Sequence, residues 1–332
     1  MRLIKLSEYD EQTMQLAKAI YDGQGRILLT ANHTIHPKIV DRLIRLGISH
    51  VVVEDAESKG ITLDEMLELP TWLDIIHAVK EAYDAAAGNK PLPLRHILKG
   101  VDQLIDEVKR RPVVVLIPAT TIADELQLYA HCVNVALLSL QIAKQMGYHE
   151  LQLRDLAVGC LLHDIGKAVA ADERKHPEAG FNMLRQIREI SLLSSHVAFQ
   201  HHEKFDGSGY PRAISGKDVH EYAQVCAVAN TYENALSKEK MSPHEAVEVI
   251  MALNGTSFNP EVVDAFIKSI APYPPGTKVV LSNGEQAIVI KIISHMQRPV
   301  VRILATEQEI SLADHPSLMI TGELTLSTTS SG

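Results

Sequence analysis

Two short segments of the sequence concentrate side chains that could bind a metal ion. The first is His163-Asp164-Ile165-Gly166-Lys167, and the second is His201-His202-Glu203-Lys204-Phe205-Asp206-Gly207-Ser208-Gly209-Tyr210-Pro211. Together they contain three histidines, two aspartates, one glutamate and two lysines. Burying so many polar groups without a cation is unfavourable, because they lose their hydration. The pattern predicts a divalent metal site, whose natural chemistry is hydrolysis by metal-activated water.

Helical periodicity predicts that several of these residues face the protein interior. His131 lies on the apolar stripe of a helix predicted over residues 126–146. Taken alone, such a histidine is more often a core residue with satisfied hydrogen bonds than a metal ligand. Asp164 continues the apolar stripe of the next predicted helix, where an unpaired carboxylate would be strongly destabilising. We therefore expect Asp164 to be paired with a cation, which is either Lys167 or a metal ion.

The remaining histidines of the candidate site lie at predicted helix ends. His176 directly precedes Pro177 and takes the predicted N-cap position, although histidine is a mediocre cap. Neighbouring residues on a helix diverge by roughly 100°, so His201 and His202 are expected to serve different ions. This predicts two metals, with Glu203 and Asp206 available as hydrogen-bond partners for the imidazoles.

The order of these residues resembles the HD-GYP branch of the HD phosphohydrolases, over roughly residues 94–270. That family is all-helical and metal-dependent, and it opens the bacterial second messenger cyclic di-GMP. The resemblance implies that the metal ligands are His131, His163, Asp164 (bridging), His176, His201 and His202. It also implies that Lys167 contacts the substrate phosphate, which makes Lys167 and Asp164 the catalytic candidates. The loop residues Gly207, Gly209, Tyr210 and Pro211 would shape the rim of the site and offer a surface to a protein partner.

The chain departs from the family pattern at three places. Asn230 stands where the family has an aspartate as its last ligand, and it is expected to be a weaker, neutral ligand. The alternative is that Asn230 only hydrogen-bonds within the helix bundle. Gln127 replaces a glutamate that supports a third metal in some members, which favours two ions. A basic Arg-Pro-Tyr segment is also missing, and Lys238 and Lys240 are its nearby substitutes for holding substrate.

Composition limits the class of protein. Of the 332 residues, 46% are hydrophobic and 22% are charged, which is ordinary for a soluble globular chain. A formal charge of −9 argues against binding a nucleic-acid polymer, although it leaves a small anionic substrate open. We expect no membrane span and no secretory signal, because apolar runs of the necessary kind are missing. The three cysteines are expected to be reduced core thiols of a cytoplasmic protein.

The pattern of elements predicts a mainly α protein with three parts. Residues 1–93 form an N-terminal α+β module, with a hairpin around Asp22-Gly23, a helix from His36-Pro37 to Gly47, a strand over 50–53 and an acidic helical linker. Residues 94–271 form the HD-GYP core, with the main predicted helices over residues 126–146, 153–168, 177–190, 192–202, 219–237, 243–253 and 260–270. Residues 272–332 form a small β module with strands over 278–281, 287–293 and 300–304 and a frayed tail over 327–332.

The sequence thus predicts a metal-dependent phosphodiesterase that hydrolyses cyclic di-GMP to linear pGpG, to GMP or to both. Two divalent ions are expected, with iron or manganese preferred and magnesium, zinc or nickel also compatible. Two alternatives stay open, a non-hydrolysing cyclic-dinucleotide sensor or adaptor and an HD phosphohydrolase for another nucleotide. A homodimer is also compatible with the sequence.

Overall fold

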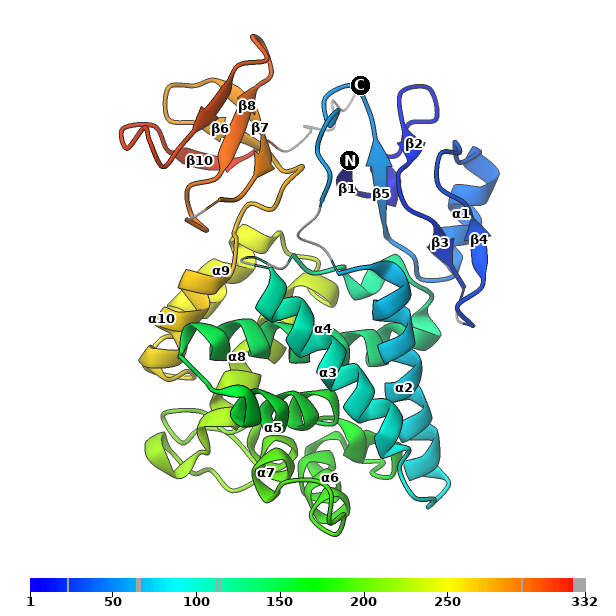
Figure 1. The fold of residues 1–332 in the computed structure, drawn as a ribbon, viewed down its shortest axis with the longest axis vertical. Coiled ribbons are helices and arrows are strands. Elements are labelled where there is room, and N and C mark those ends of the chain that lie inside the picture. Colours follow the sequence, from blue (N-terminus) through cyan, green and yellow to red (C-terminus); the bar gives the residue numbers. More distant parts are fainter. Residues whose placement is uncertain (23, 64–66, 112, 114, 294, 325–332) are drawn as a thin grey trace, which may run out of the picture. The chain divides into compact units, whose positions relative to one another are not determined.

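The structure is a computed structural model, and it describes all residues except 23, 64–66, 112, 114, 294 and 325–332. The described residues group into two compact units. Unit 1 combines residues 1–64 with residues 271–332, and unit 2 comprises residues 65–270. The expected fold class is confirmed, since a helical core is accompanied by small sheets from both ends of the chain (Figure 1). The predicted frayed tail begins at residue 327 and lies outside the described residues.

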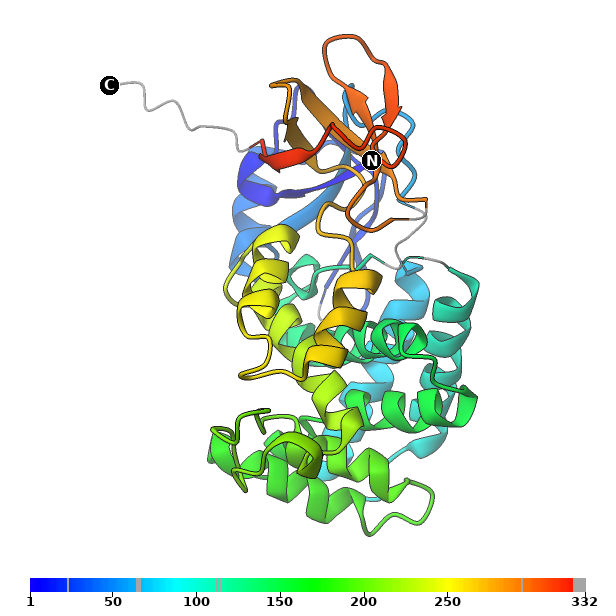
Figure 2. The same ribbon diagram turned by 90° about the vertical axis from the view of Figure 1, so that its left-hand side faces the viewer.

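Unit 2 is a bundle of helices packed around α4 (Figures 1 and 2). Its helices are α2 Leu69–Ala87, α3 Leu94–Arg110, α4 Asp124–Gln145, α5 Glu150–Leu161, α6 His176–Leu184, α7 Leu192–Gln200, α8 Glu221–Ser237, α9 Pro243–Ala252 and α10 Pro260–Ser269. Helix α4 packs against α2, α3, α5, α8 and α10. It is long and apolar enough to cross a membrane, but 83% of its most apolar window is buried inside the protein. Its apolar character is therefore explained by its central place in the bundle.

The ends of several helices follow from residues that the sequence already shows. Ser242 and Glu245 form a capping box at the start of α9, and Pro243 is its first residue. Asn259 caps α10 through a hydrogen bond from the amide of Glu261 to its side chain, and Pro260 is the first residue of that helix. Helix α5 differs from the prediction over residues 153–168. It ends at Leu161, and the chain resumes as a short 3₁₀ turn, η3 (Ile165–Ala168), because the His163-Asp164 pair occupies the break between them.

The described residues of unit 1 form three sheets. β1 (Arg2–Lys5), β5 (His50–Glu54) and β2 (Gln15–Leu16) form one antiparallel sheet in the order β1-β5-β2, with α1 (Pro37–Arg45) between β4 and β5 in the chain. β3 (Ile20–Tyr21) and β4 (Ile27–Leu29) form the predicted hairpin. The C-terminal sheet has the order β10-β6-β7-β8-β9, from β6 (Lys278–Leu281), β7 (Gln286–Lys291), β8 (Val300–Ile303), β9 (Glu309–Ser311) and β10 (Ile320–Glu323). The short strands β9 and β10 were not predicted.

The contacts group the chain differently from the three predicted parts. Residues from both ends meet within unit 1, where Arg302 donates to the carbonyl of Lys59 at 2.8 Å and Lys278 pairs with Glu57. Helix α2, assigned by sequence to the N-terminal module, packs on α3 and α4. The division at residues 93 and 271 into separate domains stays a prediction.

Candidate metal centre

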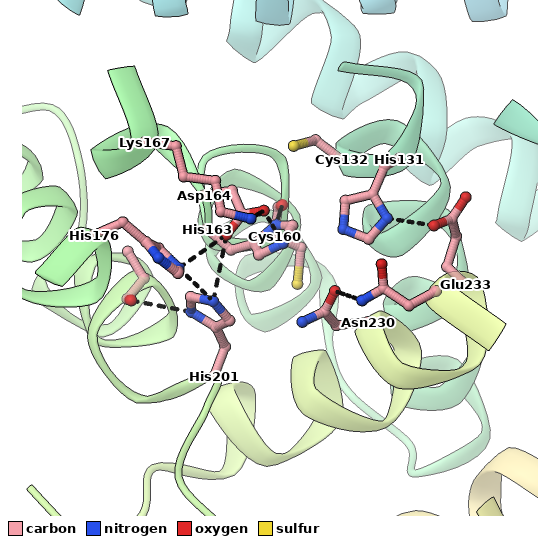
Figure 3. Close-up of polar contacts among 12 residues, drawn as sticks. His131, Cys132, Cys160, His163, Asp164, Lys167, His176, His201, Asn230 and Glu233 are labelled. Carbon is pink, nitrogen blue, oxygen red and sulfur yellow. Dashed lines mark hydrogen bonds and ion pairs between the residues drawn. The ribbon is translucent and has the colours of Figure 1, made fainter. Parts of the chain in front are cut away.

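Four elements of unit 2 bring the predicted ligands together around Asp164 (Figure 3). His131 lies on α4, and His163 and Asp164 follow the end of α5. His176 is the first residue of α6, so the predicted N-cap position is wrong, and the cap position belongs to Lys175. His201 caps the C-terminal end of α7, and His202 follows it. All of these residues are buried except His202, which is half-buried.

Asp164 is the shared member of two clusters of potential ligand atoms. In one cluster it lies with His176, His201 and His202, and in the other with His131 and His163. Its Oδ1 is 3.0 Å from Nε2 of His176 and 3.5 Å from Nε2 of His201. Its Oδ2 is 3.5 Å from Nε2 of His163 and 2.5 Å from Nζ of Lys167. Of the two cations expected for this carboxylate, Lys167 is therefore in place, and the clustered histidines are arranged to add a metal ion.

The backbone determines which nitrogen each imidazole presents to the centre. Nδ1 of His163 lies 2.8 Å from the carbonyl of Cys160, and Nδ1 of His201 lies 3.0 Å from that of Ala198. Nδ1 of His176 contacts the carbonyl of Glu173. Since a carbonyl only accepts, each Nδ1 carries the proton and each Nε2 offers a lone pair to the cluster.

These atoms fit divalent cations. Nε2 of His163, Oδ1 of Asp164 and Nε2 of His202 are buried and have no hydrogen-bond partner among the described residues. Nε2 of His176 and Nε2 of His201 face each other at 3.3 Å, although neither carries a proton. A cluster of lone pairs and a carboxylate in this arrangement is unfavourable until a cation is shared between them.

The pKa shifts of the histidines and of Asp164 favour the deprotonated forms that bind a metal ion. Burial lowers the pKa of His163, His201 and His202, so these imidazoles are neutral, as metal ligands must be. Burial alone would raise the pKa of Asp164, but the polar surroundings of the centre hold it well below its usual value, so the carboxylate is charged. A negative charge surrounded by neutral imidazoles is the charge distribution that attracts a divalent cation.

His201 and His202 belong to the same cluster of potential ligand atoms, although the sequence suggested that they serve different ions. That expectation assumed a continuous helix through both residues. Helix α7 ends at Gln200, so the helical divergence of roughly 100° does not govern this pair. Their rings have centroids 4.1 Å apart. The second cluster is instead supplied by His131 and His163.

The Gly-Tyr-Pro loop is held against the centre by contacts that explain its composition. The ring of Tyr210 stacks on His202 with centroids 4.5 Å apart, and the guanidinium of Arg174 lies 5.0 Å from the same ring centroid. Burial raises the pKa of Tyr210 to about 12. At Gly209, a Cβ atom would lie 2.4 Å from the amide nitrogen of Lys204, so only glycine fits. This loop therefore forms part of the rim beside His202.

Glu203 and Asp206 have a different role from the one expected. The buried carboxylate of Glu203 accepts hydrogen bonds from the amides of Arg212 at 2.7 Å and Ile214 at 3.3 Å. Asp206 accepts from the amide of Ser208 at 2.9 Å. Both acids order the loop, while backbone carbonyls hold the imidazoles of His163, His176 and His201.

The residues that depart from the family pattern are placed as follows. Asn230 is 7% exposed on α8, and its Oδ1 accepts a hydrogen bond from Asn234 at 3.0 Å. Gln127 donates to the carbonyl of Ile122 and to Asp124. Lys240 is exposed beyond the C-terminal end of α8. The ligand role of Asn230 and the substrate role of Lys240 stay predictions.

One functional residue escaped the sequence reasoning. Glu233 on α8 is 1% exposed, and its carboxylate contacts Nδ1 of His131 (Figure 3). This fixes His131 with Nε2 toward the centre, in a carboxylate–histidine arrangement typical of metal sites. The helical pattern of the sequence could have predicted this contact, because Glu233 lies on the same helical face as Cys226 and Asn230. A carboxylate on an inward face is unfavourable unless it has a hydrogen-bond partner.

The segment that contains this site is similar to known proteins. Residues 128–235 match the HD domain family. Cyclic di-GMP phosphodiesterase PA4108 of Pseudomonas aeruginosa is 29% identical over 234 residues, which cover 64% of this chain and 56% of that protein. A cyclic di-GMP phosphodiesterase of Thermotoga maritima is 31% identical over 165 residues, or 43% of this chain and 45% of that protein.

Among solved structures, Bd1817, a HDG"Y"P protein from Bdellovibrio bacteriovorus, aligns with 80% of this chain and 97% of its own, at a TM-score of 0.48 and 14% identity. The chain spans about half the length of the curated relatives it matches. The segment that matches the HD domain, residues 128–235, contains the buried His163-Asp164 pair and the ordered Gly-Tyr-Pro loop.

Proposed function

We propose that this protein is a metal-dependent phosphodiesterase that hydrolyses cyclic di-GMP to linear pGpG, GMP or both, in bacterial second-messenger signalling. The observation that carries the proposal is the buried Asp164 carboxylate ringed by Nε2 lone pairs of His163, His176 and His201. Imidazole and carboxylate ligands of this kind suit divalent ions that activate water for hydrolysis. Relatives of this chain are named cyclic di-GMP phosphodiesterases.

The proposed ion-binding residues are His131, His163, Asp164, His176, His201 and His202, with Asn230 as a weaker additional ligand. When bound, divalent ions supply Lewis acidity for the attack of water on a phosphodiester. We propose two ions and prefer iron or manganese, since nitrogen and carboxylate ligands suit both.

The protein's own groups would orient and stabilise the substrate. Lys167 has Nζ beside Asp164 and is 25% exposed, so its charge is available to phosphate oxygens at the centre. It would offset negative charge that develops on those oxygens during cleavage. Tyr210 keeps its hydroxyl proton at neutral pH and offers a hydrogen-bond donor at the rim.

The direct test is incubation of the purified chain with cyclic di-GMP and Mn²⁺ or Fe²⁺, followed by chromatographic separation of the products. We expect pGpG or GMP to accumulate only with metal, and the Asp164→Ala variant to form neither. Because other relatives are named 3'3'-cGAMP-specific phosphodiesterases, 3'3'-cGAMP is assayed in parallel. Cleavage of that nucleotide alone would contradict the proposed substrate and support the related-nucleotide alternative.

A second candidate function is a cyclic-dinucleotide sensor or adaptor that binds without cutting. The neutral side chain of Asn230, where the family has an aspartate, favours it, because a neutral oxygen attracts a cation less strongly. If calorimetry shows that the chain binds cyclic di-GMP, and prolonged incubation with metal gives no product, the sensor function would be supported and the enzymatic function contradicted. In either case we propose a cytoplasmic location, where the buried thiols of the three cysteines stay reduced.

A further inference from the structure

His131 differs from the other histidines of the centre in how its Nδ1 is held. Those of His163, His176 and His201 bind carbonyls only three residues earlier in the chain. His131 contacts the carboxylate of Glu233 instead, which lies on another helix. The orientation of His131 therefore depends on the packing of α4 against α8, whereas the other rings are fixed by their own turns.

The carboxylate of Glu233 is itself held by two further groups. Oε2 accepts from the hydroxyl of Ser237 at 2.9 Å, and Oε1 lies 3.4 Å from Nδ2 of Asn134. Asn134 is 1% exposed and lies one turn after His131 on α4. A buried carboxylate needs such donors, because each unmet hydrogen bond is unfavourable in the interior. Asn134 thus helps to set the position of the acid that orients His131.

The amide of Asn134 has one allowed orientation, and Trp72 determines it. The indole Nε1 of Trp72 on α2 donates to Oδ1 of Asn134 at 3.1 Å. Nδ2 then points to Glu233 and to the carbonyl of Ile117, at 3.0 Å from the latter. An indole N–H can only donate, so it holds the oxygen end of the amide on its own side. A flipped amide would face the carboxylate of Glu233 with its oxygen.

We propose that Trp72, Asn134 and Glu233 form a positioning relay that sets the orientation of His131 and with it the metal affinity of the cluster containing His131 and His163. The inference deepens the proposed function and rests on its metal site. Trp72 lies in the first turn of α2, which is the first helix after residues 1–64. A displacement of that turn therefore has a physical route to His131 through Asn134 and Glu233.

The first experiment measures Mn²⁺ binding to the full chain by calorimetry, without nucleotide. Glu233→Gln is expected to weaken the affected site by about 10–100-fold, the usual effect of removing a partner of a ligand histidine. Trp72→Phe keeps an aromatic ring but removes the N–H, and it is expected to weaken the same site by a smaller factor. The matched control is Tyr83→Phe, which removes a buried hydroxyl from α2 that contacts Sγ of Cys132 on α4.

The second experiment combines the two relay variants in a double-mutant cycle. If the residues act in series, Trp72→Phe should add little to the loss already caused by Glu233→Gln. Any one of four results would overturn the relay. These are equal Mn²⁺ affinity in Trp72→Phe and the native chain, purely additive losses in the double variant, an equal loss in Tyr83→Phe, and a native chain that binds no Mn²⁺. If Glu233→Gln fails to fold, Ser237→Ala takes its place, because it removes one donor from the same carboxylate.

These outcomes separate the relay from the proposed activity. If the native chain binds Mn²⁺ and the variants show the predicted cycle, but no cyclic dinucleotide is cleaved, the relay is supported and the phosphodiesterase activity is contradicted. A chain that cleaves cyclic di-GMP but shows unchanged Mn²⁺ affinity in Trp72→Phe retains the enzyme and loses the relay.

Discussion

The position of one proton decides what each histidine of the centre can do. A carbonyl beside Nδ1 forces the proton there, and the lone pair of Nε2 is then the only group left to face Asp164. The same backbone contact fixes the plane of the ring. A single turn of chain, such as Cys160 to His163, therefore prepares a ligand before any ion arrives, which reduces the ordering that metal binding requires.

Asp164 and Lys167 should separate metal binding from turnover. Asp164→Ala removes the charged ligand common to both clusters, so metal content and hydrolysis should be lost together. Lys167→Ala should retain the metals and lower kcat by about 10²–10³-fold, because it removes charge that acts mainly in the transition state. Elemental analysis beside steady-state kinetics checks both. Equal loss of metal in the two variants would contradict the assigned roles.

Asn230 should respond to restoration of a carboxylate. Asn230→Asp is expected to tighten the binding of one ion and to raise the rate of phosphodiester cleavage, because a charged oxygen attracts a cation more strongly than an amide oxygen. The measurement is the dependence of hydrolysis on Mn²⁺ concentration for both proteins. Asn234→Asp, one turn further on the same helix, is the matched control. An unchanged metal dependence in Asn230→Asp would assign Asn230 to hydrogen bonding alone.

At the scale of elements, most residues of the candidate site lie at helix ends or in the breaks between helices. The sequence predicted most helices within a few residues, because caps such as Ser242 and Asn259 mark their starts. It placed one continuous helix through the His163-Asp164 pair, since periodicity alone cannot show that a ligand requires a turn. It also missed Glu233, whose role depends on contact between α4 and α8. Local patterns thus pointed to candidate ligands that the structure brings together, while the contact that orients His131 depends on packing between distant segments.

Gly166 shows how closely these elements approach. A Cβ atom there would lie 2.0 Å from the carbonyl oxygen of His176 and 2.7 Å from the amide nitrogen of Gly180. Gly166→Ala should therefore push η3 away from α6, displace His176 and weaken Mn²⁺ binding by at least about 10-fold. Calorimetry tests this, with Gly322→Ala as the control because nothing lies within 4 Å of its added Cβ. Native affinity in Gly166→Ala would show that His176 is not a ligand.

At the scale of the whole molecule, each of the two units buries charged groups of its own. Unit 1 contains a buried ion pair, in which Arg2 Nε lies 2.7 Å from Oδ2 of Asp55. Burial alone would raise the pKa of Asp55, but hydrogen bonds from Arg2 and Ser58 hold it below its ordinary value of 3.8. Unit 2 has buried carboxylates of its own, among them Asp164 at the candidate metal centre and Glu233 beside His131.

The pH response of unit 1 follows from the sign of this shift. Since the pKa of Asp55 is lower in the folded state, its contribution to stability is present above about pH 4 and is lost as the pH falls through the folded-state value. Asp55→Asn should thus destabilise unit 1 at pH 7 and show a smaller difference from the native chain at pH 3. Urea unfolding at both pH values measures this, with exposed Asp314→Asn as the control. A deficit that is independent of pH would contradict the linkage.

Metal binding should stabilise unit 2 alone. Ions that bind the native centre and not the unfolded chain add stability in proportion to RT ln(1 + [L]/Kd), or about 2.7 kcal/mol when the free ion is at 100 times Kd. Differential scanning calorimetry should show two unfolding transitions, of which Mn²⁺ raises one and a chelator lowers the same one. Asp164→Ala should abolish the shift and leave the other transition in place. If Mn²⁺ raises both transition temperatures together, the two units unfold as one cooperative body. Metal binding would then stabilise α2 through this cooperativity, without the hydrogen bond of Trp72.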